Sequence, residues 1–143
     1  MQIEVVTQAD EELYQAFQNL VPQLTNNNVP PSLNDLAALV RDSSSTLMVA
    51  RDDNGKIVGA LTLAVYRVPT GIRSIIEDVI VDNSARGQGI GESLMKYAID
   101  LARKKGAKNI SLTSNPLREA ANRLYLRMGF KKRETNAYQM KLK

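Results

Sequence analysis

The fold is decided by the stretch Arg86-Gly87-Gln88-Gly89-Ile90-Gly91. It follows the apolar run Val79-Ile80-Val81 and opens a helical pattern that begins near Glu92. Glycines between a strand and a helix let the backbone approach a ligand, and the free N–H groups of the first helical turn point at its oxygens. The helix dipole and the Arg86 side chain add positive charge. The stretch therefore predicts a phosphate-binding loop.

Other kinds of glycine-rich loop fit the stretch less well. A Walker loop needs Lys followed by Ser or Thr after the last glycine, and Glu92-Ser93 does not supply that pair. A dinucleotide fingerprint needs Gly-x-Gly-x-x-Gly, whereas Gly87, Gly89 and Gly91 alternate. The spacing is instead Arg-x-x-Gly-x-Gly. An ordinary glycine-rich loop that only caps a helix remains the alternative.

Composition limits the chemistry of this chain. Its 143 residues fit one domain, and 43% hydrophobic and 24% charged residues are typical of a globular protein. The chain has no cysteine, which excludes disulfides, thiolate metal sites and a cysteine nucleophile. It also has no histidine, the commonest general base and metal ligand. Acid–base chemistry must therefore use carboxylates, tyrosines, lysines or water.

Charge is distributed unevenly along the chain. Residues 1–94 carry 6 Lys and Arg against 12 Asp and Glu, whereas residues 95–143 carry 13 against 3. The basic part could face a polyanionic ligand or nucleic acid, and the acidic part could favour a cationic substrate. The alternative is that the lysines only solvate helix faces. No apolar run approaches the roughly 20 residues that span a bilayer, and no signal peptide is apparent at the N-terminus, so we expect no membrane association and a cytoplasmic location.

Periodicity predicts an α+β domain with a central mixed sheet over residues 1–143. Helices are expected from Thr7 or Asp10 through Val21, from a cap at Ser32 through Val40, from the glycine-rich stretch to Gly106, and from a cap at Asn115 to Gly129. Residues 22–32 are predicted to form a loop. The expected strands are residues 3–6, 46–51, 57–66, 72–81, 110–113, 130–133 and 138–142, with a hairpin turn at Asp53-Asn54-Gly55.

A second motif lies within residues 111–130, which end in Ala121-x-x-Leu124-Tyr125-x-x-x-Gly129-Phe130. This ending resembles the second cofactor motif of the GNAT superfamily of N-acetyltransferases, and the stretch from Arg86 to Gly91 resembles that superfamily's acyl-CoA pyrophosphate loop. The separation of the two motifs, one helix and one strand, also matches. With their flanking strands they cover roughly residues 72–142. By this resemblance the chain is identified as a member of the superfamily.

The resemblance implies transfer of an acetyl group from acetyl-CoA to an amine, by direct attack in a ternary complex and without a metal. It implies a splayed strand pair in which Val79, Ile80 and Val81 offer backbone groups to the pantetheine arm. It also implies that Arg86, Gly87, Gln88, Gly89, Ile90 and Gly91 receive the pyrophosphate, and that Asn122 and Tyr125 approach the pantetheine and the sulfur. Arg118 stands where many relatives have Asn; it could reach a phosphate or only be exposed.

The implied reaction needs an acid and a base, because an alkyl amine with a pKa near 10 is protonated at neutral pH. Tyr125, placed by the motif, is the candidate acid for the departing sulfur; the alternative is a core tyrosine. Glu77 and Asp78 are the candidate bases. Neighbours in a strand point to opposite faces, so only one can face the cleft directly. We favour Glu77, directly or through water, over an ordinary salt bridge. In this family the Val79 N–H fits the oxyanion donor.

The acceptor pocket is expected from the first half of the chain and the C-terminus. Residues 22–32, 67–71 and 136–138 are its predicted walls, and Tyr66, Asn136 and Tyr138 are predicted substrate contacts that could equally be structural. We expect a small primary amine as acceptor and consider a homodimer possible.

Other functions remain as alternatives to acetylation of a small amine. One is acetylation of a protein or peptide amine, and another is a CoA-binding regulatory module without turnover. A nucleic-acid binder is disfavoured, because the few aromatic residues of the basic part show no interleaved stacking pattern.

Overall fold

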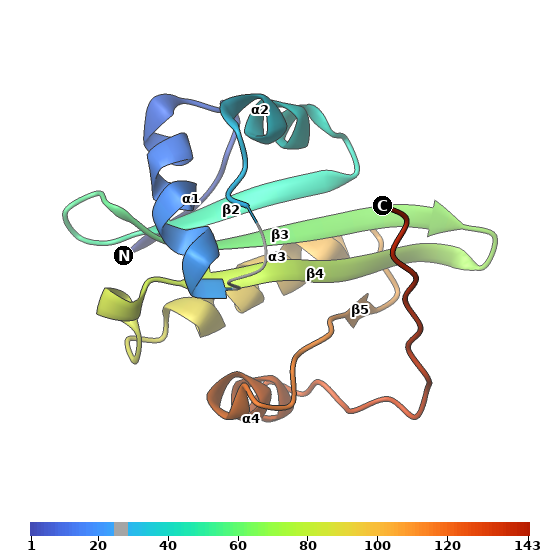
Figure 1. Cartoon of the computed structure of the whole chain (residues 1–143). Helices are drawn as coiled ribbons and strands as arrows, with labels where there is room; N and C mark the ends of the chain where they lie inside the picture. The colour runs from blue at the N-terminus through green and yellow to red at the C-terminus, as the bar shows by residue number, and fades with distance from the viewer. Residues whose placement is uncertain (25–28) are drawn as a thin grey trace. The chain divides into compact units, whose positions relative to one another are not determined.

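A five-stranded sheet organises the first part of the chain (Figure 1). The structure, a computed structural model, describes residues 1–24 and 29–143. The strands lie in the order β1 (Gln2–Val5), β2 (Ser45–Arg51), β3 (Ile57–Val68), β4 (Gly71–Val81) and β5 (Ile110–Ser111). The first four are antiparallel, and β5 runs parallel to β4. The predicted central mixed sheet is confirmed.

The chain divides into two compact units, Met1–Leu112 and Thr113–Lys143. The first contains the sheet with α1 (Glu11–Leu24), α2 (Leu33–Arg41), the short 3-10 helix η1 (Asn83–Ala85) and α3 (Ile90–Lys104). The second contains α4 (Glu119–Arg127). The order of these elements agrees with the sequence-based expectation as far as α4.

Helices cover both faces of the sheet in the first unit. Figure 1 shows α1 and α2 on one face and α3 on the other. Leu13, Phe17 and Leu20 repeat at helical spacing and are buried against the sheet with Leu36 of α2. α2 begins at the predicted cap, because the Ser32 hydroxyl accepts from the Asp35 N–H and the Asp35 carboxylate accepts from the Ser32 N–H.

The parallel strand pair separates after two residues. β4 pairs with β5 only at Ser74 and Ile75, opposite Ile110 and Ser111. The Ser74 hydroxyl is buried and donates to the Asn109 carbonyl oxygen at 2.7 Å, which fixes the start of the pairing. Beyond Ile75, β4 continues to Val81 along β3 alone. The splayed strand pair is therefore confirmed, and the strand predicted at 110–113 is shorter because its partner is lost.

The helix α1 is longer than predicted. Pro22 and Leu24, expected in the loop at 22–32, belong to α1, because the apolar stripe continues through Val21 and Leu24 onto the core. Residues 25–28 of the predicted loop lie outside the described residues. Within the part of the chain that the structure describes, no helix has the length and apolar character needed to cross a membrane.

The helix of the second unit begins later than predicted. α4 starts at Glu119 with Arg118 as its N-cap, not at Asn115. The Asn115 side-chain oxygen instead accepts from the Leu117 N–H at 2.9 Å, and the Asn115 backbone carbonyl oxygen accepts from the Arg118 N–H at 3.0 Å. These bonds close a turn that competes with the first helical turn.

The strands predicted at 130–133 and 138–142 are absent from the described residues, where 130–143 have no regular structure. Tyr138, Met140 and Leu142 alternate as in a strand but are 89%, 80% and 89% exposed. Alternation marks a face that can be buried, whereas a strand also requires a neighbour for its backbone hydrogen bonds. The sequence pattern does not show whether such a neighbouring strand is present.

Candidate active site

The glycine-rich loop has the backbone that its sequence predicts. Gly87 and Gly89 have φ angles of 80° and 78°, in the left-handed region that favours glycine. Gly89 is the N-cap of α3, and the described residues supply no side-chain cap. The first intrahelical bond is donated by the Ser93 N–H to the Gly89 carbonyl oxygen. The N–H groups that precede it can therefore donate to an anion at the helix N-terminus.

The turn that leads into this loop is anchored by Asp82. This buried carboxylate accepts from the Ser84 N–H at 3.1 Å and from the Asn19 side chain of α1 at 2.9 Å. The Ser84 N–H bond is the main reason that the pKa of Asp82 lies below its usual range. α1 makes a second contact, because the Gln23 side chain accepts from the Asn83 N–H at 2.8 Å. Together these bonds tie the turn between β4 and η1 to α1.

Arg86 returns toward the strand that precedes it. Its Nε donates to the Val81 carbonyl oxygen at 3.3 Å, and the side chain is exposed. The structure therefore brings together the predicted pantetheine strand, Val79–Val81, and the predicted pyrophosphate loop, Arg86–Gly91. Both lie in the first unit, at the same end of the sheet.

Gly59 allows α3 to lie directly on the sheet at this end. A Cβ at Gly59 would come within 3.1 Å of the Ile90 side chain, 3.2 Å of the Leu94 side chain and 3.2 Å of the Ile80 carbonyl oxygen. Gly59 pairs with Val81 across β3 and β4. Because Gly59 has no side chain, the start of α3 can pack closely beside the end of β4.

The two candidate bases lie at a β-bulge. The register between β3 and β4 shifts between Ala60 and Thr62, which pair with Ile80 and Glu77, and Asp78 has a φ of 51°. The bulge interrupts the alternation of the strand, and both carboxylates are exposed. That only one of them faces the cleft stays a prediction. Partial burial and the Asp78 carboxylate raise the pKa of Glu77.

Tyr125 is the buried residue of α4, with 7% of its surface exposed. Its ring packs edge-to-face on Phe130, with centroids 6.1 Å apart. Burial raises the pKa of the Tyr125 phenol, and the positive charge of Arg118 opposes that shift. Like an ordinary tyrosine, the phenol is protonated at neutral pH, as a proton donor requires, and the raised pKa makes it a weaker acid. Arg118 itself is exposed and acts on Tyr125 through its charge.

The other predicted residues of the second unit make local contacts. The Asn122 side chain donates to the Asn115 carbonyl oxygen at 3.0 Å and so ties α4 to the turn before it. Asn136 donates to the Tyr138 hydroxyl at 3.3 Å, and both side chains are exposed. The roles expected for Asn122 in cofactor binding and for Asn136 and Tyr138 in substrate binding stay predictions.

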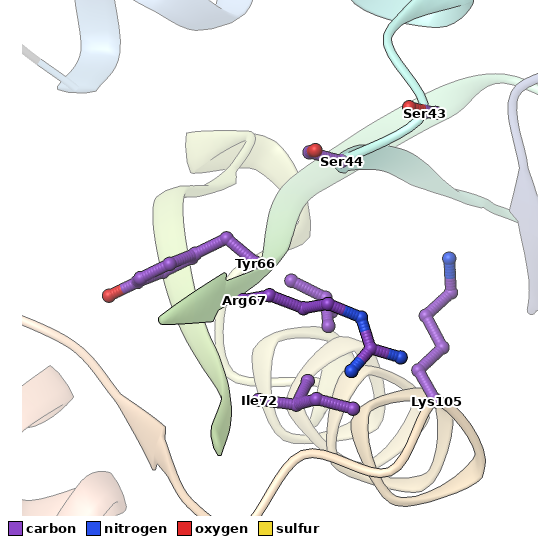
Figure 2. A pocket seen from close by; sticks show the side chains of 7 residues that line it. Ser43, Ser44, Tyr66, Arg67, Ile72 and Lys105 are labelled. Atoms are coloured by element: carbon purple, nitrogen blue, oxygen red, sulfur yellow. The ribbon is translucent and has the colours of Figure 1, made fainter. Parts of the chain in front are cut away.

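Tyr66 lies far along β3 from the phosphate loop. It pairs with Arg73, whereas Gly59 pairs with Val81, and seven residues of strand span about 23 Å. Tyr66 borders a cavity of about 550 Å³ near the end of α3, but Figure 2 shows its ring extending away from the Arg67 and Lys105 side chains. The structure therefore does not bring Tyr66 together with the phosphate loop.

Two positioning residues, Asp82 and Gly59, were not predicted from the sequence. Each carried a signal: an aspartate two residues before Ser84 is typical of a side chain that closes a turn, and a single glycine in an apolar strand indicates a close backbone approach. Among the residues that the structure describes, no cluster of acidic side chains could hold a metal ion.

Comparison with known proteins assigns the arrangement to a family. The model of the acetyltransferase (GNAT) family matches residues 10–130. The chain belongs to the GNAT family. A crystal structure of an aminoglycoside acetyltransferase from an uncultured soil metagenomic sample, in complex with trehalose, superposes with a TM-score of 0.86 at 22% identity, covering 99% of this chain and 96% of that one. That likeness confirms the fold of this GNAT protein.

Curated relatives match part of the chain. Streptothricin acetyltransferase of Streptomyces lavendulae is 37% identical over 89 residues, which are 62% of this chain and 46% of that protein. Glucosamine 6-phosphate N-acetyltransferase of Trypanosoma brucei brucei is 33% identical over 92 residues, which are 62% of this chain and 60% of that protein. The matched segment thus spans about half of each relative.

Proposed function

We propose that this GNAT protein transfers an acetyl group from acetyl-CoA to an amine. The observation that carries the proposal is the start of α3, where Gly87 and Gly89 present backbone N–H groups at the end of β4, beside its splayed segment. Pyrophosphate and a helix N-terminus are complementary in charge and in hydrogen bonding. Membership of the GNAT family supports acetyl-CoA as the ligand.

The residues present fit the pyrophosphate and the pantetheine arm of acetyl-CoA. No side chain caps α3 among the described residues, so the loop is open to the pyrophosphate, and Arg86 adds a positive charge. From Ile76 to Val81, β4 has no strand beside it on the β5 side in the described residues, which leaves Val79, Ile80 and Val81 to bond the pantetheine amides. When bound, acetyl-CoA supplies a thioester whose C–S bond breaks as the amine nitrogen bonds the carbonyl carbon.

The protein's own residues then move protons and stabilise charge. Glu77 takes the proton that the ammonium must lose, directly or through water, and its raised pKa brings it nearer the pKa of a useful base. The Val79 N–H donates to the developing oxyanion. Tyr125, whose phenol is protonated at neutral pH, donates to the departing sulfur.

We propose a small primary amine as the acceptor. The two relatives described above are named for acetylation of streptothricin and of glucosamine 6-phosphate. The exposed carboxylates of Glu77 and Asp78 would attract an ammonium group to the bulge of β4. We also propose that residues 1–143 work as one acetyltransferase domain, because the family match runs from the first unit into the second. The cytoplasmic location, the homodimer and the lack of a nucleic-acid partner stay predictions from the sequence.

The test is a titration of acetyl-CoA combined with thiol release against a panel of small primary amines and peptides. We expect saturable binding, and thiol release that depends on one class of small amine. Release only with peptides would replace the small-amine acceptor by a protein amine. Tight binding without release on any amine would contradict turnover and favour a regulatory module. No binding would overturn the assignment of the Arg86–Gly91 loop.

A further inference from the structure

A cation-lined cavity lies at the opposite end of α3 from the phosphate loop. Its volume is about 550 Å³, and it is lined by residues of the first unit: Ser43, Ser44, Val65, Arg67, Ile72 and Lys105, with Tyr66 at its border. α3 has 15 residues, so this end lies about 22 Å from the glycine-rich loop. The cavity is therefore separate from the site proposed for the acetyl-CoA pyrophosphate.

The side chains of β3 alternate between the two faces of the sheet, and this alternation places a positive charge near the C-terminal end of α3. Gly59 faces α3, and every second residue from it along β3 shares that face. Leu61 and Leu63 are buried there, Val65 follows, and Arg67 ends the row. Ile72, directly opposite Arg67 on β4, shares the face. The row thus changes from apolar to cationic where α3 ends.

Two exposed cations, Arg67 and Lys105, border this solvent-open cavity without partners among the described residues. Figure 2 shows the Arg67 guanidinium and the Lys105 ammonium extending into the same space, with the hydroxyls of Ser43 and Ser44 across it. Within residues 1–24 and 29–143, neither cationic side chain has a hydrogen-bond or ion-pair partner. The neighbouring Asp42 carboxylate is engaged elsewhere, because it accepts from the Ser44 N–H at 2.8 Å. Two unpaired cations facing one cavity favour an anion between them.

We propose that this cavity binds a small molecule that carries a phosphomonoester group. Guanidinium, ammonium and two hydroxyls offer donors from several directions, which suits a tetrahedral dianion with three free oxygens better than a planar carboxylate. The C-terminal end of a helix dipole disfavours anions, so binding here depends on the two side-chain charges. The cavity is large enough for an organic body on Val65 and Ile72 beside the phosphate.

The test uses phenyl phosphate, inorganic phosphate and acetate as probes of the full chain. Titration is followed by the backbone amide signals of a ¹⁵N-labelled sample and by calorimetry. We expect phenyl phosphate to shift the signals of Ser43, Ser44 and Arg67, to bind more tightly than inorganic phosphate, and to bind far more tightly than acetate. Saturating acetyl-CoA should leave this binding unchanged.

Substitutions assign the binding to the two cations. We expect R67Q to raise the Kd of phenyl phosphate about tenfold or more, as for loss of a charged hydrogen-bonding group, and K105Q to raise it about fivefold. R67K should restore part of the affinity. K104Q removes a neighbouring exposed charge that does not line the cavity and should have no effect.

Unchanged acetyl-CoA affinity shows that each variant is folded. Equal affinity of R67Q and wild type, an equal loss with K104Q, signal shifts confined to residues 86–91, or competition by acetyl-CoA would each overturn the proposal. If phenyl phosphate does not bind at this cavity but acetyl transfer is intact, the proposal for the cavity is wrong and the proposed function is unaffected.

Discussion

The two compact units are expected to contribute different kinds of group to acetyl transfer. In Met1–Leu112 the groups expected to bind acetyl-CoA belong mainly to the backbone: left-handed glycines, the first N–H groups of α3 and the unpaired edge of β4. A buried sheet core fixes them. In Thr113–Lys143 they are side chains of α4, Tyr125 and Asn122. We infer that the first unit governs mainly how tightly acetyl-CoA binds and the second how fast it reacts.

The largest expected effect comes from the second unit. Tyr125→Phe keeps the edge-to-face packing on Phe130 but removes the proton donor. We expect turnover to fall about 10- to 100-fold, at the lower end of what acid catalysis contributes, with little change in acetyl-CoA affinity. Steady-state thiol release and calorimetry measure the two quantities. Tyr97→Phe, which changes a partly exposed tyrosine of α3, is the control and should leave both unchanged.

Glu77 belongs to the first unit, but we expect its substitution to change the turnover rate. Glu77→Gln should lower turnover about tenfold or more, because the base is lost. In the wild type, activity should fall on acidification as Glu77 becomes protonated, and its raised pKa places that fall at a higher pH than for an ordinary glutamate. Asp78→Asn removes a cause of the raised pKa, so the fall should move to lower pH. An unchanged pH profile in both variants would exclude Glu77 as the base.

A smaller effect is expected from the exposed charge at the phosphate loop. Arg86→Gln should weaken acetyl-CoA binding about fivefold, since exposed ion pairs contribute up to about 1 kcal/mol. Turnover at saturating acetyl-CoA should not change. Because ionic contacts are screened by salt, the difference between variant and wild type should shrink at high ionic strength. A difference in Kd that is independent of salt would show that Arg86 acts only through the bond to the Val81 carbonyl.

The smallest effect concerns the anchor of the loop. Asp82→Asn should lower the free energy of unfolding by about 1 kcal/mol, the net value of a typical hydrogen bond. Since folding lowers the pKa of Asp82, its charge-dependent stabilisation is present above the ordinary aspartate pKa and is lost as the pH falls through the lowered one. Denaturant unfolding at neutral and at acidic pH should therefore show the two proteins converging in acid. A constant difference would contradict this role.

The same comparison explains what the sequence could predict. In the first unit, helical spacing and strand alternation report burial directly, so Leu13, Phe17, Leu20 and the glycine-rich turn were placed correctly. Family motifs singled out Tyr125 and the loop as site residues, and their roles stay predictions. The bulge at Asp78 could not be predicted from the sequence, because it depends on the register between two strands, and register is a property of the pair.

In the second unit the local signals were misleading. Asn115 followed by Pro116 is a favoured helix start, yet the Asn115 side chain closes a turn and α4 begins four residues later. The alternation at Tyr138, Met140 and Leu142 predicted a strand that the described residues do not form. Local patterns state which structure a segment can adopt, whereas pairing and burial decide which one it does adopt.

The division between binding and rate is tested most directly by measuring the acetyl-CoA Kd and the turnover of Gly89→Ala beside Tyr125→Phe. An alanine at a φ of 78° is strained even though no atom of the described residues lies within 4 Å of the added methyl group. That strain is about 1–2 kcal/mol, so relaxation of the loop should raise the Kd about five- to thirtyfold. We predict that Gly89→Ala raises the Kd, whereas Tyr125→Phe lowers turnover at an unchanged Kd. An unchanged Kd for Gly89→Ala, or a raised Kd for Tyr125→Phe, would contradict the account.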